Sequence, residues 1–472
     1  MGAPPQVIRA LDDRFDVTLR ELMELSRIPS VSASGFDPKQ VERSADAVAL
    51  LLEEVGCEGV EVLRLGDAHP YVLAKCPARG PDAQGAPTVL IYAHHDVQPP
   101  GRADHWVTPA FEPTLRDDGR LYGRGVVDDK AGLMLHVAAV RAWIEAAGGP
   151  PLNVTLIVEG EEETGSAHLL DFLREHRERL DADVLVLSDT ANLATGVPSI
   201  TTSLRGIVQI DLTVTALDHP IHSGMWGGPV PDAASALSRI LGQLFDASGA
   251  PAVLGLEDDV PVIDASERAR LAALPFDAEV FRRDAGMRDG VELRGAEDGS
   301  VYERLWLRPS LSVVALEAMP LAEATNQLVA EARARVSVRL APGQDANRVA
   351  ACVVRQLEQA PPAGVRVRAE VTAAVPGWKR GSETEVLGAA QRALSAGFGC
   401  DAVLIGCGAT IPFVGPFSDA MGGIPELLLG LEDPPCNAHG ENESLDLDDF
   451  RKAAHSSAHL LAELKTTLAE KR

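Results

Sequence analysis

Histidine and carboxylate side chains stand in short polar segments that directly follow apolar runs of the sequence. The first such segment contains His94 and Asp96, after the run TVLIYA at 88–93. An H-x-D step in an extended chain places both side chains on the same side. Asp96 can therefore accept a hydrogen bond from one imidazole nitrogen of His94 while the other binds a metal ion. A histidine in this place is by itself more often a surface residue, so the pattern gains weight only together with other candidates.

Acidic residues fill three further segments of the N-terminal half. Asp128 and Asp129 follow the glycine-rich segment 123–125 and precede a helical stretch, which is also the ordinary pattern of an acidic helix N-terminus. Four glutamates stand within residues 159–163, and Asp189 follows another apolar run. Carboxylates that emerge together from buried strands repel one another unless a cation lies among them, and divalent metal ions supply that charge. The segments therefore favour a metal site over a solvated acidic run.

The last candidate ligand, His439, lies far along the chain in the polar segment CNAHGENE, before the final helical stretch. Alone it is equally well explained as an exposed loop histidine. With the N-terminal segments it completes a set of two histidines and several carboxylates at strand ends, where open α/β sheets collect their ligands. Mixed nitrogen and oxygen ligands suit Zn²⁺, with Mn²⁺ or Co²⁺ as alternatives. Neither a GxxxxGK[ST] nor a GxSxG motif occurs, which disfavours nucleotide and serine-hydrolase chemistry.

The elements that must position these residues alternate between strands and helices in the N-terminal half. Short apolar runs at 88–93, 153–159 and 182–188 are separated by helical stretches such as 131–147 and 166–176. Buried apolar strands that alternate with helices predict an α/β layer with a mostly parallel sheet.

A different pattern begins at Gly206, where apolar and polar residues alternate as in half-exposed antiparallel strands. The α/β character returns near Pro376. We therefore predict one α/β domain with a mostly parallel sheet, formed by residues 1–204 and 378–472. A smaller α+β domain, residues 205–377, is inserted into it.

The bulk composition narrows the classes of partner and compartment. At 472 residues the chain is long enough for two domains, and its 43 Lys and Arg against 69 Asp and Glu give a net charge of −26. This charge argues against nucleic-acid and anionic-membrane partners. No apolar run approaches the ~20 residues of a membrane span, and no secretory leader is visible. The six cysteines are scattered without a CxxC pair, so we expect reduced thiols and a cytoplasmic protein.

In these residues and the segments around them, the sequence resembles the zinc peptidase family that includes carnosine dipeptidases, aminoacylases and glutamate carboxypeptidase. The matching segments run in order along nearly the whole chain. They are YAHHDVQP (92–99), LYGRGVVDDKAG (121–132), EGEEETGS (159–166), LSD (187–189), HSGMWGG (222–228), RPSLS (308–312), ARVSVRLAPGQ (334–344) and NAHGENE (437–443). The RPSLS segment and the long inserted domain look most like the dipeptidase branch.

The resemblance implies a dinuclear metal centre. Its implied ligands are His94, Asp128, Glu163, Asp189 and His439. Asp128 would bridge two divalent ions, and a cis peptide bond would follow it. Glu162 would be the general base, and Asp96 the hydrogen-bond partner of His94.

The resemblance also assigns roles within the inserted domain. Family members are usually dimers through this domain, and His222 would reach the active site of the neighbouring subunit to stabilise the oxyanion. Asn326 and Arg339 match lid positions that grip the carbonyl and the C-terminal carboxylate of the substrate. The glycine-rich loop at 405–412 departs from the family because it lacks the usual arginine, although Thr410 could still donate a hydrogen bond.

We predict metal-dependent hydrolysis of a peptide bond in dipeptides or short peptides, with Glu162 as the base that activates water. The same centre would also serve a deacylase of N-acyl or N-succinyl amino acids. A non-catalytic, metal-binding, dimeric interaction protein is the third possibility. The retained Glu162 argues against it, because a purely structural site needs ligands but no base.

Overall fold

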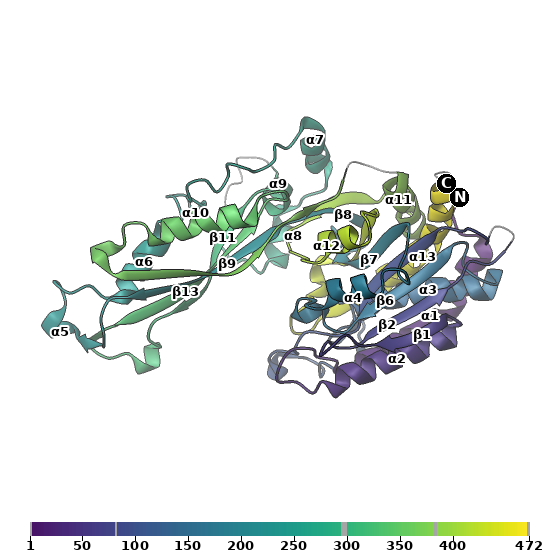
Figure 1. Ribbon diagram of the computed structural model, residues 1–472, viewed down its shortest axis with the longest axis horizontal. Coiled ribbons are helices and arrows are strands. Elements are labelled where there is room, and N and C mark those ends of the chain that lie inside the picture. Colours follow the sequence, from purple (N-terminus) through teal and green to yellow (C-terminus); the bar gives the residue numbers. More distant parts are fainter. Residues whose placement is uncertain (1, 81–82, 294–299, 382–384, 470–472) are drawn as a thin grey trace. The chain divides into compact units, whose positions relative to one another are not determined.

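The computed structural model describes residues 2–80, 83–293, 300–381 and 385–469 (Figure 1). Its chain divides into two compact units. The larger unit consists of Met1–Thr202, Arg380–Ile405 and Phe413–Arg472, and the smaller unit of Ser203–Lys379 and Gly406–Pro412.

One large sheet contains nine strands among the described residues. These are β1 (Glu58–Leu63), β2 (Tyr71–Cys76), β3 (Thr88–His94), β6 (Asn153–Glu159), β7 (Val184–Ala191), β8 (Ser199–Leu204), β15 (Trp378–Lys379), β16 (Val403–Cys407) and β17 (Glu426–Glu432). The order is β1-β2-β6-β3-β7-β17-β8-β15, with β16 paired to β8. The four central strands β6, β3, β7 and β17 are parallel, and the strands on either side pair antiparallel. The predicted α/β fold with a mostly parallel sheet is confirmed.

Helices of the larger unit cover both faces of this sheet (Figure 1). One face packs on α1 (Pro5–Ser26), α2 (Lys39–Val55), α3 (Lys130–Ala147), α11 (Glu385–Phe398) and α13 (Leu447–Ala469). The other face carries α4 (Leu169–Glu175) and α12 (Val414–Ala420), where Phe172 contacts Tyr71 and Phe417 contacts Tyr92. Because successive strand residues point to opposite faces, Ile91 joins the first core, whereas the ring of Tyr92 lies 5.7 Å from that of Phe417 on α12. None of the helices in the described ranges combines the length and apolar composition that crossing a bilayer requires.

A small three-stranded sheet joins the C-terminal part of the chain to its N-terminal half. It contains β4 (Thr114–Leu115), β5 (Arg120–Tyr122) and β18 (Ser444–Asp446) in the order β18-β5-β4. Ser444 pairs with Tyr122, so the segment before β18 lies beside the segment after β5. Three short 3₁₀ turns complete this unit: η1 (Ala103–His105), η2 (Glu162–Thr164) and η5 (Pro434–Cys436).

The smaller unit is built on a four-stranded antiparallel sheet in the order β11-β13-β9-β14. Its strands are β9 (Gly206–Thr215), β11 (Ser310–Glu317), β13 (Glu331–Leu340) and β14 (Arg366–Val375), and α6 (Ala233–Gly242) and α10 (Ala346–Glu358) share their core. Burial alternates along β9, as its sequence pattern predicts for a sheet with one covered face. The remaining elements are β10 (Ile221–His222), α5 (Ser223–Trp226), α7 (Ala265–Ala273), α8 (Ala278–Asp284), α9 (Val301–Trp306), η3 (Leu321–Glu323), β12 (Gln327–Leu328) and η4 (Pro362–Gly364).

The cysteines depart from the expectation of reduced thiols. Cys57 and Cys76 form a disulfide, with their Cα atoms 4.8 Å apart. The reason is strand register: Glu58 pairs with Lys75 in the β1–β2 ladder, which places the two cysteines opposite each other. Because the pair is separated by 19 residues and has no characteristic spacing, the sequence pattern gave no sign of it. The expectation is wrong for this pair, and the other four cysteines form no disulfide with any residue that the structure describes.

A buried histidine in the helical layer predicts a pH dependence of stability. His136 on α3 lies 2.8 Å from the Ser457 hydroxyl through Nδ1 and 2.9 Å from the Ser188 hydroxyl through Nε2. Burial lowers the pKa of His136 to about 3. In the unfolded chain the imidazole binds a proton near pH 6.5, so below that pH the unfolded state binds more protons than the folded state. The free energy of unfolding should therefore fall by about 1.4 kcal/mol per pH unit from this group, down to pH ~3.

The measurement is urea unfolding of the wild type and of His136→Gln at pH 7 and pH 5. Between these values the wild type should lose about 2 kcal/mol more than the variant. An equal loss in both proteins would assign the pH dependence to other groups.

Candidate metal centre

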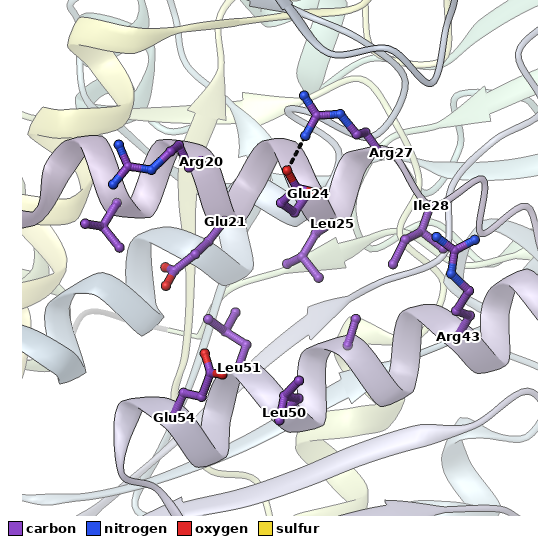
Figure 2. Close-up of a pocket in the computed structure, with 12 residues that line it drawn as sticks. Arg20, Glu21, Glu24, Leu25, Arg27, Ile28, Arg43, Leu50, Leu51 and Glu54 are labelled. Carbon is purple, nitrogen blue, oxygen red and sulfur yellow. Dashed lines mark hydrogen bonds and ion pairs between the residues drawn. The ribbon is translucent and has the colours of Figure 1, made fainter.

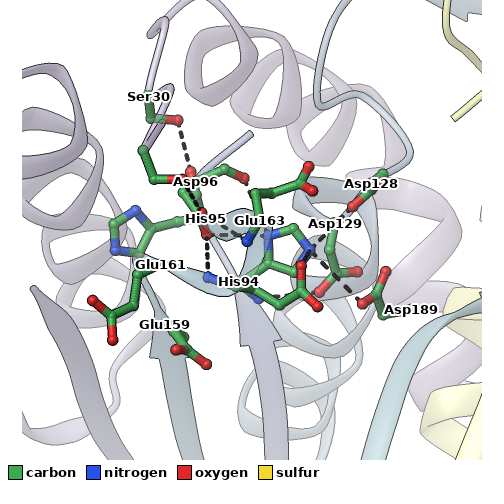
Figure 3. A network of polar contacts seen from close by, with 12 residues as sticks. Ser30, His94, His95, Asp96, Asp128, Asp129, Glu159, Glu161, Glu163 and Asp189 are labelled. Carbon is green, nitrogen blue, oxygen red and sulfur yellow. Dashed lines mark hydrogen bonds and ion pairs between the residues drawn. The ribbon is translucent and has the colours of Figure 1, made fainter. Parts of the chain in front are cut away.

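The predicted ligands of the larger unit gather at the carboxyl ends of its parallel strands. His94 is the last residue of β3, Asp189 lies in β7, and Glu163 follows β6 within η2. Parallel strands end at the same edge of a sheet, so the polar segments after them converge. Figure 3 shows these side chains together above the strand ends, with Asp128 approaching from the loop before α3.

The Asp128 carboxylate lies between the two predicted histidine ligands. Its Oδ1 is 3.0 Å from Nε2 of His94, and its Oδ2 is 2.9 Å from Nε2 of His439. Oε2 of Glu163 lies 3.3 Å from the same nitrogen of His439. One carboxylate that faces a histidine with each oxygen has the geometry of a bridging ligand. The peptide bond between Asp128 and Asp129 is cis.

Three groups among the described residues could each hold a metal ion, and two of them contain a histidine. Asp128, Glu163 and His439 form the first, and His94, Asp129 and Asp189 the second; in each, one ligand atom per residue lies within 4.8 Å of the others. All five ligands expected from the sequence are therefore brought together. Each of these two groups offers one imidazole and two carboxylates, a donor set that suits zinc and similar divalent ions.

Two further observations fit a bound cation. Oδ1 of Asp129 is fully buried and has no hydrogen-bond partner in the part of the chain that the structure describes, and the buried Nε2 of His94 forms no hydrogen bond of normal geometry although Oδ1 of Asp128 is 3.0 Å away. Buried polar atoms of this kind are rare in folded proteins. Burial also raises the pKa of Asp189, and it raises the pKa of Glu162 to about 8, with repulsion from Glu163 and Asp128 adding to the effect on Glu162. A centre this crowded with carboxylates requires positive charge to keep them ionised.

Asp96 supports both His94 and the turn that carries Glu162. Nδ1 of His94 is 3.1 Å from the backbone oxygen of Asp96 and 3.4 Å from its Oδ1, on the ring side away from Asp128. The Asp96 carboxylate also accepts hydrogen bonds from the backbone N–H groups of Glu162 and Glu163, at 3.2 and 3.1 Å, and from the Ser32 hydroxyl at 2.6 Å. The sequence predicted the contact with the histidine. It did not predict that the same carboxylate fixes the η2 turn.

A buried ion pair that sequence reasoning missed connects the two loops around the centre. Arg124 donates to Oε2 of Glu443 at 2.6 Å and to the backbone oxygen of His439 at 3.0 Å. Glu443 also accepts from the backbone N–H groups of Gly125 and Val127, both at 3.1 Å. Both charged side chains are almost fully buried. The pair therefore holds the loop of Asp128 against the loop of His439.

Arg124→Met should weaken both folding and metal binding. The substitution leaves Glu443 buried without its counter-charge, which typically costs about 3–5 kcal/mol. Urea unfolding with a chelator present measures the stability of the metal-free protein, and competition with a chelator measures metal affinity. Arg102→Met is the matched control, because the Arg102–Glu441 pair also involves the loop of His439, at 2.9 Å, but Arg102 is 66% exposed. It should change neither quantity measurably, and equal effects of the two variants would contradict the role of the buried pair.

The predicted residues of the smaller unit form two separate groups. His222 on β10 pairs with Gln327 on β12, and the N–H of Ser223 donates to the backbone oxygen of Asn326 at 2.8 Å. His222 and Asn326 are therefore neighbours, and the histidine is exposed. In the second group, Nη1 of Arg339 donates to the Thr410 hydroxyl at 2.8 Å.

Two acidic residues near the centre were not predicted as ligands from the sequence. One is Asp129, and the other is Glu432. It ends β17, and one of its oxygens lies within 4.8 Å of oxygens of Asp128 and Asp189. Burial, followed by repulsion from Asp128, raises the pKa of Glu432 to about 8. The signal was present in the sequence, because Glu432 follows an apolar run as the other candidates do.

A groove of about 670 Å³ between α1 and α2 has a different character (Figure 2). Leu25 and Leu51 line it together with charged residues, among which Arg27 donates to Glu24. Its lining contains neither histidine nor cysteine and none of the predicted site residues. This groove therefore offers no candidate catalytic residues, and the candidate site is the metal centre.

Comparison with known proteins gives a consistent relationship over nearly the whole chain. The model of "Peptidase family M20/M25/M40" matches residues 90–463. The chain is 32% identical over 447 residues to the cysteinylglycine-S-conjugate dipeptidase of Corynebacterium striatum, covering 94% of this chain and 95% of that protein. It is 29% identical over 461 residues to the human β-Ala-His dipeptidase, and the match covers 93% of this chain and 88% of that protein.

Solved structures agree with these matches. Human carnosine dipeptidase 1 superposes with a TM-score of 0.85 and 26% identity, covering 98% of this chain and 100% of that one. The Saccharomyces cerevisiae dipeptidase Dug1p superposes with a TM-score of 0.83 and 25% identity, and the match covers 98% of each chain. The family resemblance, the fold and the prediction of a metallopeptidase similar to the dipeptidase branch are confirmed. The chain belongs to the peptidase family M20/M25/M40.

Proposed function

We propose that this chain is a dinuclear metallodipeptidase that hydrolyses the peptide bond of dipeptides or short peptides. The observation that carries the proposal is the Asp128 carboxylate between His94 and His439, with Glu162 beside them. Oε2 of Glu162 lies 3.9 Å from Nε2 of His94. The relatives named above as dipeptidases support the substrate class.

The proposed cofactors are two divalent metal ions, zinc first, with manganese or cobalt as alternatives. His94, Asp128 and Asp189 would hold one ion, and Asp128, Glu163 and His439 the other. Ions held there would supply the positive charge that lowers the pKa of a water molecule from its bulk value to about 7.

Glu162 would act as the general base and then as the general acid. It accepts the proton of the attacking water and donates it to the leaving amine nitrogen, as peptide cleavage requires. Two structural features suit it for this role. Its backbone N–H is held by Asp96, and burial raises the pKa of its carboxyl, so it retains a proton more readily than a solvated glutamate does.

The inserted domain, residues 205–377, would serve as lid and dimerisation domain of the catalytic domain formed by residues 1–204 and 378–472. Asn326, Arg339 and Thr410 would bind the carbonyl and the carboxylate of the substrate. The edge strand β11 supports a homodimer, since its Val313, Val314 and Leu316 are 37%, 57% and 62% exposed. Apolar edge strands are normally covered.

A release assay on metal-reconstituted protein tests the proposed function. The panel contains dipeptides beside N-acetyl and N-succinyl amino acids, with Glu162→Gln as the blank. Dipeptides should be cleaved well above the acylated compounds. The reverse preference would make the protein a deacylase, and no turnover with two metal ions bound would indicate a non-catalytic protein.

A mixing experiment tests the proposed action of His222 from the neighbouring subunit. His222→Ala alone should lose about 10²- to 10³-fold in rate, as when an oxyanion donor is removed. Mixed with Glu162→Gln, it should regain about a quarter of wild-type activity, because about half of the dimers are mixed and each mixed dimer has one intact site. No recovery after subunit exchange would place the action of His222 within its own chain.

A further inference from the structure

Glu432 lies beside the proposed metal ligands but is not needed to complete either group of them. It ends β17, which is the parallel neighbour of β7, the strand that carries Asp189. The two groups that each contain a histidine already provide three ligands apiece. The group of Asp128, Asp189 and Glu432 is different, because all three of its members are carboxylates.

The Glu432 carboxylate has no hydrogen-bond or ion-pair partner among the described residues, and it is partly exposed. Its neighbours in this group, Asp128 and Asp189, are also acidic, and the positive charge that acts on it comes from His439, itself a proposed metal ligand. Nor is this group a surface patch. The fully buried Nε2 of His94 lies 3.0 Å from Oδ1 of Asp128 and 3.7 Å from Oδ2 of Asp189, so two of the three carboxylates face the metal centre.

The chemistry of three converging carboxylates selects a particular ligand. An ammonium group has three N–H donors, a positive charge and no acceptor, so it can bond to several carboxylate oxygens at once. An acylated amine has one N–H and no charge, and it would leave Glu432 unpaired. A dipeptide carries a free α-ammonium group by definition, whereas an N-acyl amino acid does not.

We propose that Glu432 binds the α-ammonium group of the substrate and thereby selects free dipeptides over N-acylated compounds. This inference rests on the proposed function and names the residue that sets its substrate class. Glu432 acts on the amino end of the substrate, on the side of the centre where its carboxylate lies near that of Asp189.

The test compares Glu432→Gln with the wild type, both loaded with two zinc ions. The substrates are the best dipeptide of the panel and its N-acetyl derivative. Because the variant loses a charge-assisted hydrogen bond to the substrate, its KM for the free dipeptide should rise and its kcat/KM should fall by about 10- to 100-fold. The N-acetyl derivative should be cleaved at the wild-type rate. Metal content by mass spectrometry should remain two ions per chain.

Two further variants serve as controls. Glu426→Gln makes the same change at the first residue of β17, which is also partly exposed, and should leave the selectivity unchanged. Glu432→Asp keeps the charge on a shorter side chain and should recover part of the preference for the free dipeptide. If the glutamine variant does not fold, the preference of Glu432→Asp for the free dipeptide over the N-acetyl derivative still tests the role of this residue.

The outcomes separate this inference from the proposed function. Equal losses on both substrates, or an unchanged preference, would overturn the role of Glu432 while dipeptide cleavage by the wild type stands. Loss of one metal ion in Glu432→Gln would make it a ligand instead. A wild type that prefers the N-acetyl derivative would overturn both proposals.

Discussion

Glu162→Gln should retain both metal ions and lose about 10²- to 10⁴-fold in kcat on the best dipeptide. Glutamine keeps the size of the side chain but cannot accept the proton of the attacking water. The backbone N–H of residue 162 would still be held by Asp96, so the turn should keep its shape. The measurements are steady-state kinetics on metal-loaded protein and metal content by mass spectrometry.

Glu161→Gln is the control for this result, because it makes the same change one residue earlier. The Glu161 carboxylate contacts the Tyr71 hydroxyl at 3.2 Å and Nδ1 of His168 at 2.9 Å. Its substitution should therefore lower the free energy of unfolding, whereas kcat should stay close to the wild-type value. Wild-type turnover in a metal-loaded Glu162→Gln protein would remove Glu162 from the mechanism.

Asp128→Ala should release both metal ions and abolish activity. The carboxylate faces His94 with one oxygen and His439 with the other, so its removal takes a ligand from both proposed ion sites at once. His439→Ala removes a ligand from one group only and should release one ion more readily than the other. Titration with a chelator, followed by mass spectrometry of the protein, distinguishes these patterns.

Asp128→Asn controls for the cavity that alanine leaves, since asparagine fills the same space. It should weaken both metal sites without the loss of packing. Two tightly held ions in Asp128→Ala would contradict the bridging role.

The sequence predicted most of the parallel sheet and the five candidate ligands because their signals are local. A short apolar run followed by a polar residue marks a buried strand and its end, as at His94 and Asp189, whatever the rest of the chain does. The features it missed depend on pairing between distant segments. The Cys57–Cys76 disulfide follows from the register of two strands, and the Arg124–Glu443 pair joins residues more than 300 positions apart.

Glu432 was missed for a different reason. Its position after an apolar run is the same local signal, but the run ELLLGLE is followed by Asp433 and two prolines, which resemble an ordinary polar turn. Only the parallel pairing of β17 with β7 reveals that this strand end lies beside Asp189. The order of strands in a sheet is a tertiary property that no local pattern encodes.

Arg124 and Glu443 join two loops that are translated at different times, so the site is assembled late in synthesis. His94 emerges early, whereas His439 and Glu443 are translated nearly 350 residues later. At ordinary rates of synthesis this interval lasts roughly 20–70 s. During it the nascent chain carries the first proposed ligands and the proposed base but lacks His439. The proposed centre is therefore complete only after residue 443 has been translated, and we expect a product that ends before it to lack peptidase activity.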